Sequence, residues 1–483
     1  MTDASLPVSD DVRTYDLIVI GAGPVGENVA DRAVQRGLSA VIIESELVGG
    51  ECSYWACMPS KGLLRAGSAL RAARAVDGAR QAITGDLDVA GVLRRRDALT
   101  HSWNDSSQVK WLEGAGIDLV RGHGRLIGEK RVSVTSADGV VTELAARYAV
   151  AVCTGSAALL PDTRGLADIS PWTSREATSA EQVPESLAII GGGVVAAEMA
   201  TAYNDLGSAV TLIVRGALLG GMEPFAGELV ADALRERGVT LRLGAHVTEA
   251  HRTDGTAELT LDDGTVVRAA EVLVATGRVP RTGDLGLDTV GLEPGSWLEV
   301  DDTLRVRGSD WLYAVGDVNH RALLTHQGKY QARAAGDVIA ARATGGAVDD
   351  APWGTHVATA DHESVPQVTF TDPEVASVGL TEAAAQKAGR RIRTLDYDLS
   401  WVAGASTFSD DYVGQARAIV DEDRQVLIGV TFVGSEVAEL LHAATIAVVG
   451  EVPLARLWHA VPAYPTLSEV WLRFLETYGR PAA

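Results

Sequence analysis

Residues 15–26 read YDLIVIGAGPVG, an apolar run followed at once by glycines at positions 21, 23 and 26. A helical pattern continues to Arg36, and a second apolar run covers Ala40–Ile43. Strand, glycine turn, helix and strand in this order form a βαβ unit, in which the second glycine lets the backbone approach a pyrophosphate. The stretch therefore predicts a Rossmann unit that binds a dinucleotide.

The same order recurs, with Gly191 standing 170 residues after Gly21. The run Leu187–Ile190 leads into Gly191, Gly193 and Ala196, and a helical stretch to Leu206 precedes the run Ala209–Ile213. Each copy lies between an apolar strand and a helix, as the dinucleotide-binding motif requires. The chain is therefore expected to hold two nucleotide units.

The end of the second strand discriminates between dinucleotides, because a carboxylate there holds the adenosine ribose hydroxyls. Glu44 occupies this place in the first copy, whereas the second copy has Val214 followed by Arg215. An arginine without a neighbouring acid suits a 2′-phosphate, so the second site favours NADPH over NADH. The alternative is that Arg215 is a solvated surface residue.

Two cysteines follow the first unit in the string GGECSYWACMPSK, residues 49–61. No second cysteine pair and no nearby histidine accompany Cys52 and Cys57, so a structural zinc site is not expected. A cysteine pair at the start of a helix, with Lys61 close by, suits a redox-active disulfide, since a helix dipole and a cation favour the thiolate. Cys153 has no partner by sequence and is expected to be an inert buried thiol.

Length and composition limit the remaining classes of protein. The 483 residues predict about three domains, and 46% hydrophobic residues are typical of a folded globular chain. A net charge of −22 disfavours nucleic acid and anionic membranes as partners. Three cysteines and an opening without a secretion signal favour the cytoplasm, and no transmembrane segment is expected.

The cysteine string resembles the redox-active GGxCxxxxCxPSK element of the flavin disulphide reductases, which include dihydrolipoamide dehydrogenase, glutathione reductase and mercuric reductase. Further family marks follow in order from residue 15 to about residue 476: ATGRVP at 275–280, Gly316-Asp317 with the helix of His326, and VTFTDPEVASVGLTE at 368–382. The resemblance implies an α/β fold with two Rossmann-like domains and an α+β C-terminal dimerisation domain. The expected boundaries are 1–165 and 291–354 for the FAD domain, 166–290 for the NAD(P) domain and 355–483 for the interface domain.

The resemblance also implies roles for individual residues. Cys57 would lie next to the flavin, Cys52 would exchange with the substrate, and Lys61 would lie near the flavin N5 and pair with Glu198. The residues implied for FAD are Gly21, Gly23, Gly26, Glu44, Gly50, Thr154, Gly155 and Asp317, and those implied for NAD(P)H are Gly191, Gly193, Ala196, Arg215 and Gly277.

The C-terminal segment departs from the family, which has His-Pro-Thr and then Glu, the histidine serving as acid and base. Here the string is Tyr464-Pro465-Thr466-Leu-Ser-Glu469. A phenol is a poor base at neutral pH, although it can donate a hydrogen bond or a proton. Tyr464 and Glu469 are the expected catalytic residues of this segment, with His459 as the alternative base.

Mercuric reductase resembles the chain in having tyrosine at this place, but its C-terminal cysteine pair is missing, because this chain ends GRPAA. Trp55 also replaces a smaller family residue between the two cysteines. We therefore expect an FAD-dependent homodimer with a site shared between subunits, in which NADPH drives reduction of a small disulfide or another thiol-reactive acceptor. The alternatives are reduction of a quinone, dye or metal ion from the flavin, and a non-catalytic redox-sensing flavoprotein.

Overall fold

The computed structural model describes residues 12–480 of the chain. The expectation that no secretion signal is present rests on residues 1–11, which lie outside the described residues. The described residues form two compact units, one made of residues 12–58, 97–157 and 278–362 and the other of residues 59–96, 158–277 and 363–480. The first unit thus joins segments from both predicted parts of the FAD domain.

The first unit is built around a seven-stranded sheet in the order β3-β2-β1-β6-β5-β4, with β16 also paired to β6. Its central strand β1 (Arg13–Ile20) pairs in parallel with β2 and β6. The other strands are β2 (Ala40–Glu44), β3 (Asp118–Arg121), β4 (His123–Gly128), β5 (Arg131–Thr135), β6 (Val141–Val152) and β16 (Leu312–Ala314). The predicted first βαβ unit is therefore confirmed.

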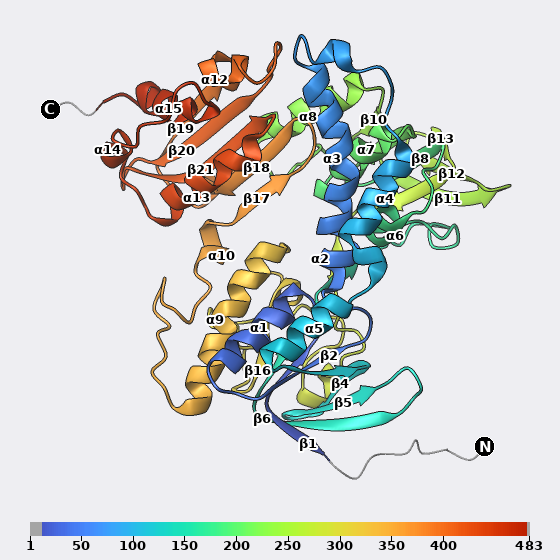
Figure 1. The fold of residues 1–483 in the computed structure, drawn as a ribbon, viewed down its shortest axis with the longest axis vertical. Helices are drawn as coiled ribbons and strands as arrows, with labels where there is room; N and C mark the ends of the chain where they lie inside the picture. The colour runs from blue at the N-terminus through green and yellow to red at the C-terminus, as the bar shows by residue number, and fades with distance from the viewer. Residues whose placement is uncertain (1–11, 481–483) are drawn as a thin grey trace. The chain divides into compact units, whose positions relative to one another are not determined.

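Side chains of β1 alternate between two cores, as expected for a strand buried on both faces. Leu17 and Val19 pack into the core that includes helices α1 (Pro24–Gln35) and α9 (Thr325–Thr344). Ile18 and Ile20 point to the opposite core, which includes residues of β4 and β5. Figure 1 shows α1 and α9 side by side on one face of the sheet.

The second unit contains the second nucleotide fold, a four-stranded parallel sheet in the order β10-β9-β8-β14. These strands are β8 (Ser186–Ile190), β9 (Ala209–Val214), β10 (Thr240–Leu243) and β14 (Glu271–Val274), with helices α7 (Val194–Asp205) and α8 (Pro224–Glu236). A separate antiparallel sheet comprises β11 (Val247–Thr253), β12 (Thr256–Leu261) and β13 (Val266–Ala269). The second βαβ unit is thereby confirmed.

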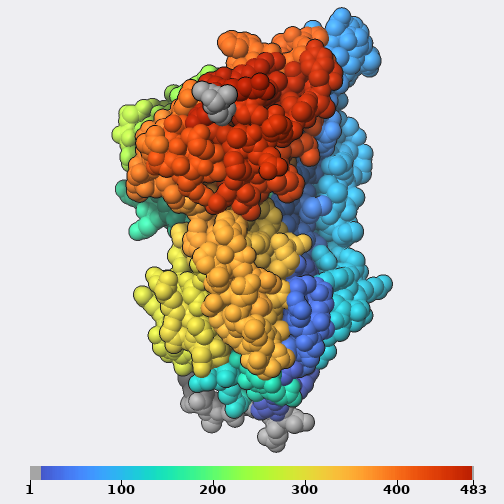
Figure 2. Space-filling view, turned by 90° about the vertical axis from the view of Figure 1, so that its left-hand side faces the viewer, coloured from blue at the N-terminus to red at the C-terminus, as the bar shows by residue number. Residues whose placement is uncertain are grey.

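The C-terminal part of the second unit is an antiparallel sheet in the order β17-β18-β21-β20-β19. Its strands are β17 (Pro366–Thr369), β18 (Glu374–Gly379), β19 (Ile392–Asp398), β20 (Gln415–Asp421) and β21 (Val426–Gly434), with helices α11 (Glu382–Lys387), α13 (Leu441–Val449) and α15 (Val470–Tyr478). The segment after β21, drawn in red in Figure 2, lies at the surface. Among the described residues, the helices are all too short or too polar to span a membrane.

Residues 57–115 contain three long helices. They are α3 (Cys57–Arg74), α4 (Val89–Leu99) and α5 (Ser106–Ala115), and the short helix α2 (Gly50–Tyr54) precedes them. α2 and α3 carry the two cysteines, so the dithiol lies where one helix ends and the next begins.

Candidate active site

The first glycine loop has the geometry of a dinucleotide cradle. Gly21 has φ +104°, and a Cβ there would lie 2.5 Å from the carbonyl oxygen of Cys153. A Cβ on Gly26 would lie 1.9 Å from the carbonyl oxygen of Gly21, so that position tolerates no side chain. Gly23, which precedes the first turn of α1, would meet nothing within 4 Å. The loop therefore packs tightly on the protein side and is open where a ligand would approach.

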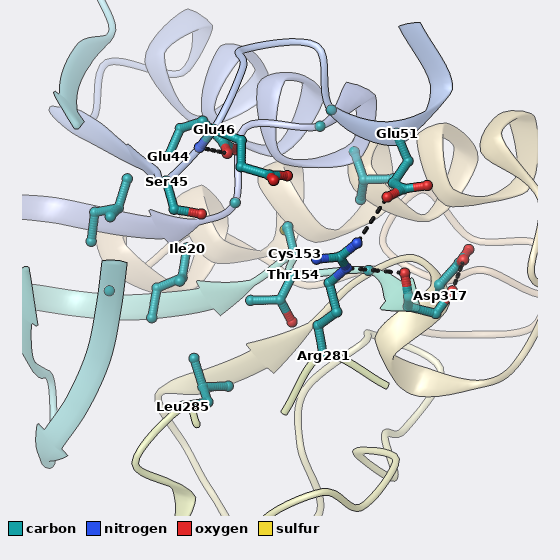
Figure 3. A pocket seen from close by; sticks show the side chains of 18 of the residues that line it. Ile20, Glu44, Ser45, Glu46, Glu51, Cys153, Thr154, Arg281, Leu285 and Asp317 are labelled. Atoms are coloured by element: carbon teal, nitrogen blue, oxygen red, sulfur yellow. Dashed lines mark hydrogen bonds and ion pairs between the residues drawn. The ribbon is translucent and has the colours of Figure 1, made fainter. Parts of the chain in front are cut away.

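This loop opens into a cavity of about 360 Å³ in the first unit, within the range of small-molecule sites. The cavity gathers most of the residues predicted to bind FAD: its lining includes Gly21, Gly23, Glu44, Gly50, Thr154, Gly155 and Asp317. Cys52 lines the same cavity. Figure 3 shows Glu44, Thr154 and Asp317 around this space.

Two polar groups in the lining fit a dinucleotide. Glu44 is buried, and its two carboxylate oxygens accept hydrogen bonds from the backbone N–H groups of Ala22 (2.8 Å) and Glu46 (2.7 Å). Burial raises the pKa of Glu44 more than these two hydrogen bonds lower it. The hydroxyl of Thr154 is buried and has no hydrogen-bond partner among the described residues, which is expected where a bound ligand supplies the partner.

The two cysteines lie beside this cavity, and both are partly exposed. Cys57 is the first residue of the 18-residue helix α3, a position at which a helix favours a negative charge. Its Sγ lies 3.4 Å from Oγ1 of Thr325, the first residue of the 20-residue helix α9. Thr325 itself lines the cavity. The structure therefore joins the cysteine string to the glycine loop through one cavity wall.

The cavity places Asp317 among charged residues to which the sequence analysis gave no role, namely Glu51, Arg278 and Arg281. Asp317 accepts a hydrogen bond from the Ser156 hydroxyl (2.6 Å), and the Arg278 guanidinium lies 3.8 Å from the same carboxylate. Arg281 forms an ion pair with Glu51 at 2.8 Å. Arg281 directly follows the ATGRVP string, and Glu51 directly precedes Cys52, so both stand next to motifs that the sequence does reveal.

The second glycine loop, in the second unit, repeats the first. Gly191 has φ +137°, and a Cβ there would lie 2.2 Å from the carbonyl oxygen of Ala275. Gly193, before α7, would meet nothing within 4 Å, and Ala196 is fully buried. Val214 is buried at the end of β9, while Arg215 after it is exposed. Gly277 follows the adjacent strand β14 with φ +148°.

Lys61 and Glu198 lie together in the second unit, as the family resemblance implies. The Lys61 ammonium is 2.8 Å and 3.1 Å from the two carboxylate oxygens of Glu198, which is 4% exposed. The backbone N–H of Phe370 also donates to Glu198 (3.0 Å), and the ammonium stands 4.6 Å from the Phe370 ring centre. A buried carboxylate with this many donors is fixed in place, so Glu198 holds the orientation of Lys61.

The C-terminal residues Tyr464 and Glu469 do not form a pair. Tyr464 is 75% exposed, whereas Glu469 is buried and accepts hydrogen bonds from the backbone N–H groups of Gly404 (3.1 Å) and Thr466 (3.3 Å). Glu469 thus shapes the backbone around Thr466, closing a capping box, and leaves the phenol side chain projecting outward. His459 is also exposed.

Comparison with known proteins extends over nearly all of this architecture. Residues 15–337 match the model of the family described as pyridine nucleotide-disulphide oxidoreductase, and residues 365–473 match that family's dimerisation domain. A mercuric reductase from Streptomyces lividans is 33% identical, and a dihydrolipoyl dehydrogenase from Halobacterium salinarum is 30% identical; in both cases the match covers 97% of each chain. The solved structure of LpdA from Mycobacterium tuberculosis is 25% identical, with a TM-score of 0.82, and the match covers 97% of this chain and 100% of that one.

The dimerisation domain supports a homodimer. Two glycine loops, a cavity lined by Cys52, and Cys57 in contact with Thr325 on the wall of that cavity are the parts that a flavin-dependent relay between a nicotinamide and sulfur requires. On this evidence the chain belongs to the pyridine nucleotide-disulphide oxidoreductase family and is an FAD-dependent NAD(P)H oxidoreductase that acts on a sulfur group.

Proposed function

We propose that the protein uses NADPH to reduce a small disulfide, or another thiol-reactive acceptor, through Cys52 and Cys57. The observation that carries this proposal is that Cys52 lines the cavity of the first glycine loop, while Cys57 contacts Thr325 on the wall of the same cavity. FAD bound there would supply the hydride and electron-transfer chemistry that links a nicotinamide to the cysteine pair. The fingerprint glycines, Glu44, Thr154 and Asp317 would hold it.

The two thiols have different proposed roles because their surroundings differ. Cys52, on the short helix α2, would attack one sulfur of the acceptor disulfide, forming a mixed disulfide and releasing the first thiol. Cys57 would then attack the Cys52 sulfur, which releases the second thiol and forms the Cys52–Cys57 disulfide. The helix start and the Thr325 hydroxyl favour Cys57 as the stored thiolate.

We assign the proton transfer that accompanies exchange to Tyr464 of the other subunit. Its exposure leaves it available to a partner, and a phenol can donate a proton or hydrogen bond to a departing thiolate. Glu469 supports this role indirectly, by fixing the backbone at Thr466. His459 would serve as the base if Tyr464 does not.

NADPH is the proposed donor because the second loop ends in Val214 and the exposed Arg215 instead of a carboxylate. The proposed contacts of this nucleotide are Gly191, Gly193 and Gly277 on the loop side and Arg215 on the 2′-phosphate, while the buried Ala196 lets the helix pack closely behind the loop.

Anaerobic titration of the purified flavoprotein with NADPH, and separately with NADH, tests this function. We expect a long-wavelength thiolate–flavin charge-transfer absorption after two electrons, formed faster with NADPH. Bleaching of the flavin without this absorption would show that the cysteine pair does not store electrons, and would direct the search to quinones, metal ions and oxygen. If the absorption forms at equal rates with NADPH and NADH, the proposed contact of Arg215 with the 2′-phosphate is wrong.

Thr325→Val is expected to make the charge-transfer absorption appear at higher pH. A hydroxyl that donates to the Cys57 thiolate stabilises the charged form, so its removal should move the midpoint of the absorption by about one pH unit. A pH titration of the two-electron-reduced protein measures the midpoint. Thr325→Ser keeps the hydroxyl and should restore the wild-type midpoint; a valine variant that titrates like wild type would contradict the assignment.

A further inference from the structure

The cavity of the first unit is lined by more carboxylates than cations. Its acidic residues are Glu44, Glu46, Glu51, Asp284 and Asp317, and its guanidinium groups belong to Arg278 and Arg281. The diphosphate of a dinucleotide brings further negative charge into this space. Backbone N–H groups of a glycine loop attract the diphosphate, but the surrounding carboxylates oppose it. Binding of the diphosphate therefore requires a cationic side chain that is free to face it.

Of the two arginines, Arg278 is already committed to Asp317 and Ser156. Its guanidinium donates to the carbonyl oxygen of Ser156 (2.8 Å) and to the Ser156 hydroxyl, which in turn donates to Asp317. With its own ion pair to Asp317 at 3.8 Å, this arginine serves to hold that carboxylate. Arg278 is accordingly a supporting residue of Asp317.

Arg281 has N–H donors that its contacts with described residues do not use. Its Nε donates to the carbonyl oxygen of Ser156 (3.1 Å), and one Nη2 N–H donates to Glu51 (2.8 Å). A guanidinium has five N–H groups, so three remain after these contacts with described residues. Figure 3 shows the Arg281 guanidinium facing Glu51. An ion pair this exposed, 37% at Arg281 and 25% at Glu51, contributes little to stability. Its effect is to aim the guanidinium.

The position of α2 against the glycine loop determines where the Arg281 guanidinium points. A Cβ on Gly50 would lie 2.8 Å from Cα of Gly23, so the first turn of α2 touches the loop that would carry the diphosphate. Glu51 is the next residue of that turn, and it holds Arg281 there from a position 230 residues away in the sequence. The backbone N–H of Arg281 also donates to Gly155 (3.1 Å), which anchors its main chain to the same cavity wall.

We propose that Arg281 is a cofactor-binding residue whose guanidinium contacts the diphosphate of the dinucleotide, with Glu51 and the Ser156 carbonyl as the groups that position it. The inference rests on the proposed placement of FAD in this cavity. The negative charge of Glu51 is neutralised in the same contact, so the acid next to Cys52 is compatible with an anionic ligand.

The rate of FAD release from the full-length holoenzyme tests the role of Arg281. The holoenzyme is diluted into buffer without flavin, and the fluorescence of the released FAD is followed. Arg281→Met should release FAD roughly 10- to 100-fold faster, since a charge-assisted contact is lost. Glu51→Gln should change the rate by less than about threefold, because the cation remains. The double variant should release FAD as fast as Arg281→Met.

Two results would overturn the proposal. One is a wild-type release rate for Arg281→Met. The other is a wild-type rate for the double variant, which would mean that Arg281 only neutralises Glu51. Arg281→Lys keeps a cation of different shape and should give an intermediate rate; it carries the test if the methionine variant does not fold, and a wild-type rate for lysine in that case would also overturn the proposal.

A glycine variant separates failure of this inference from failure of the FAD placement. An alanine at Gly23 meets nothing in the protein within 4 Å, so faster release from Gly23→Ala reports a ligand lying on the loop. Gly193→Ala is the matched control, because it makes the same change at the second loop and should leave FAD release unaltered. If Gly23→Ala releases FAD at the wild-type rate, the placement itself is wrong; if it releases faster while Arg281→Met does not, only the role of Arg281 is wrong.

Discussion

Cys52→Ser is expected to abolish reduction of small disulfides, by roughly 1,000-fold or more, while NADPH-driven reduction of a quinone or dye continues. A serine hydroxyl cannot replace the thiolate that attacks sulfur. The change is small in volume, and Cys52 is partly exposed on the cavity wall, so the fold should accept it. Parallel assays with a panel of disulfides and with a quinone measure the two rates.

Cys153→Ala is the matched control for this variant. Cys153 is buried, and burial raises the pKa of its thiol, so it has no part in the proposed exchange. Its replacement should leave both rates as in wild type. Persistence of disulfide reduction in Cys52→Ser would contradict the thiol relay. Turnover too slow to measure with every acceptor, already in the wild-type protein, would favour the redox-sensing alternative.

Glu27→Gln is expected to stabilise the protein at alkaline pH by about 3 kcal/mol. Glu27 lies on the first turn of α1, is 8% exposed, and its Oε1 has no hydrogen-bond partner among the described residues. Burial raises its pKa to about 7, with Glu44 adding to the rise and Lys329 opposing it. The folded state therefore holds a proton that the unfolded chain releases near pH 4.5, and stability falls as the pH rises from there to about 7.

Denaturant unfolding of both proteins at pH 5.5 and pH 8.5 measures this effect. The advantage of the glutamine variant should grow by about 2 kcal/mol between the two values, because the wild-type carboxylate becomes charged over that interval. Glu176→Gln provides a control of opposite sign. Burial raises the pKa of Glu176, but hydrogen bonds from Thr173 lower it by more, so the pKa lies below that of an ordinary glutamate. Wild-type Glu176 therefore contributes stability above the ordinary carboxylate pKa and loses it in acid. An advantage of Glu27→Gln that does not change with pH would contradict the buried-acid account.

Local sequence patterns were sufficient to predict both nucleotide units. The runs before Gly21 and Gly191 became β1 and β8, and the helices after them ended within a residue or so of the predicted ends, at Gln35 and Asp205. Such patterns are decided by residues a few positions apart, which is why a sequence reports them. The family comparison then confirmed the enzyme class that the cysteine string indicates.

Contacts between distant parts of the chain were not predictable in the same way. Thr325 lies 268 residues from Cys57, and Arg281 lies 230 residues from Glu51, so no periodicity links either pair. The pairing of Lys61 with Glu198 was available only through the family resemblance. Glu469 is a different case. Its place in the family motif predicts a catalytic role, whereas its hydrogen bonds in the structure are to backbone N–H groups.

The outward projection of Tyr464 has a consequence for mixtures of subunits. If each catalytic site takes its cysteines from one chain and its phenol from the other, a chain lacking Cys52 and a chain lacking Tyr464 are both inactive as homodimers. A heterodimer of the two concentrates both lesions in one site and leaves the other site intact. Co-expressing two dead alleles would then restore activity to about half of the wild-type level in each mixed dimer.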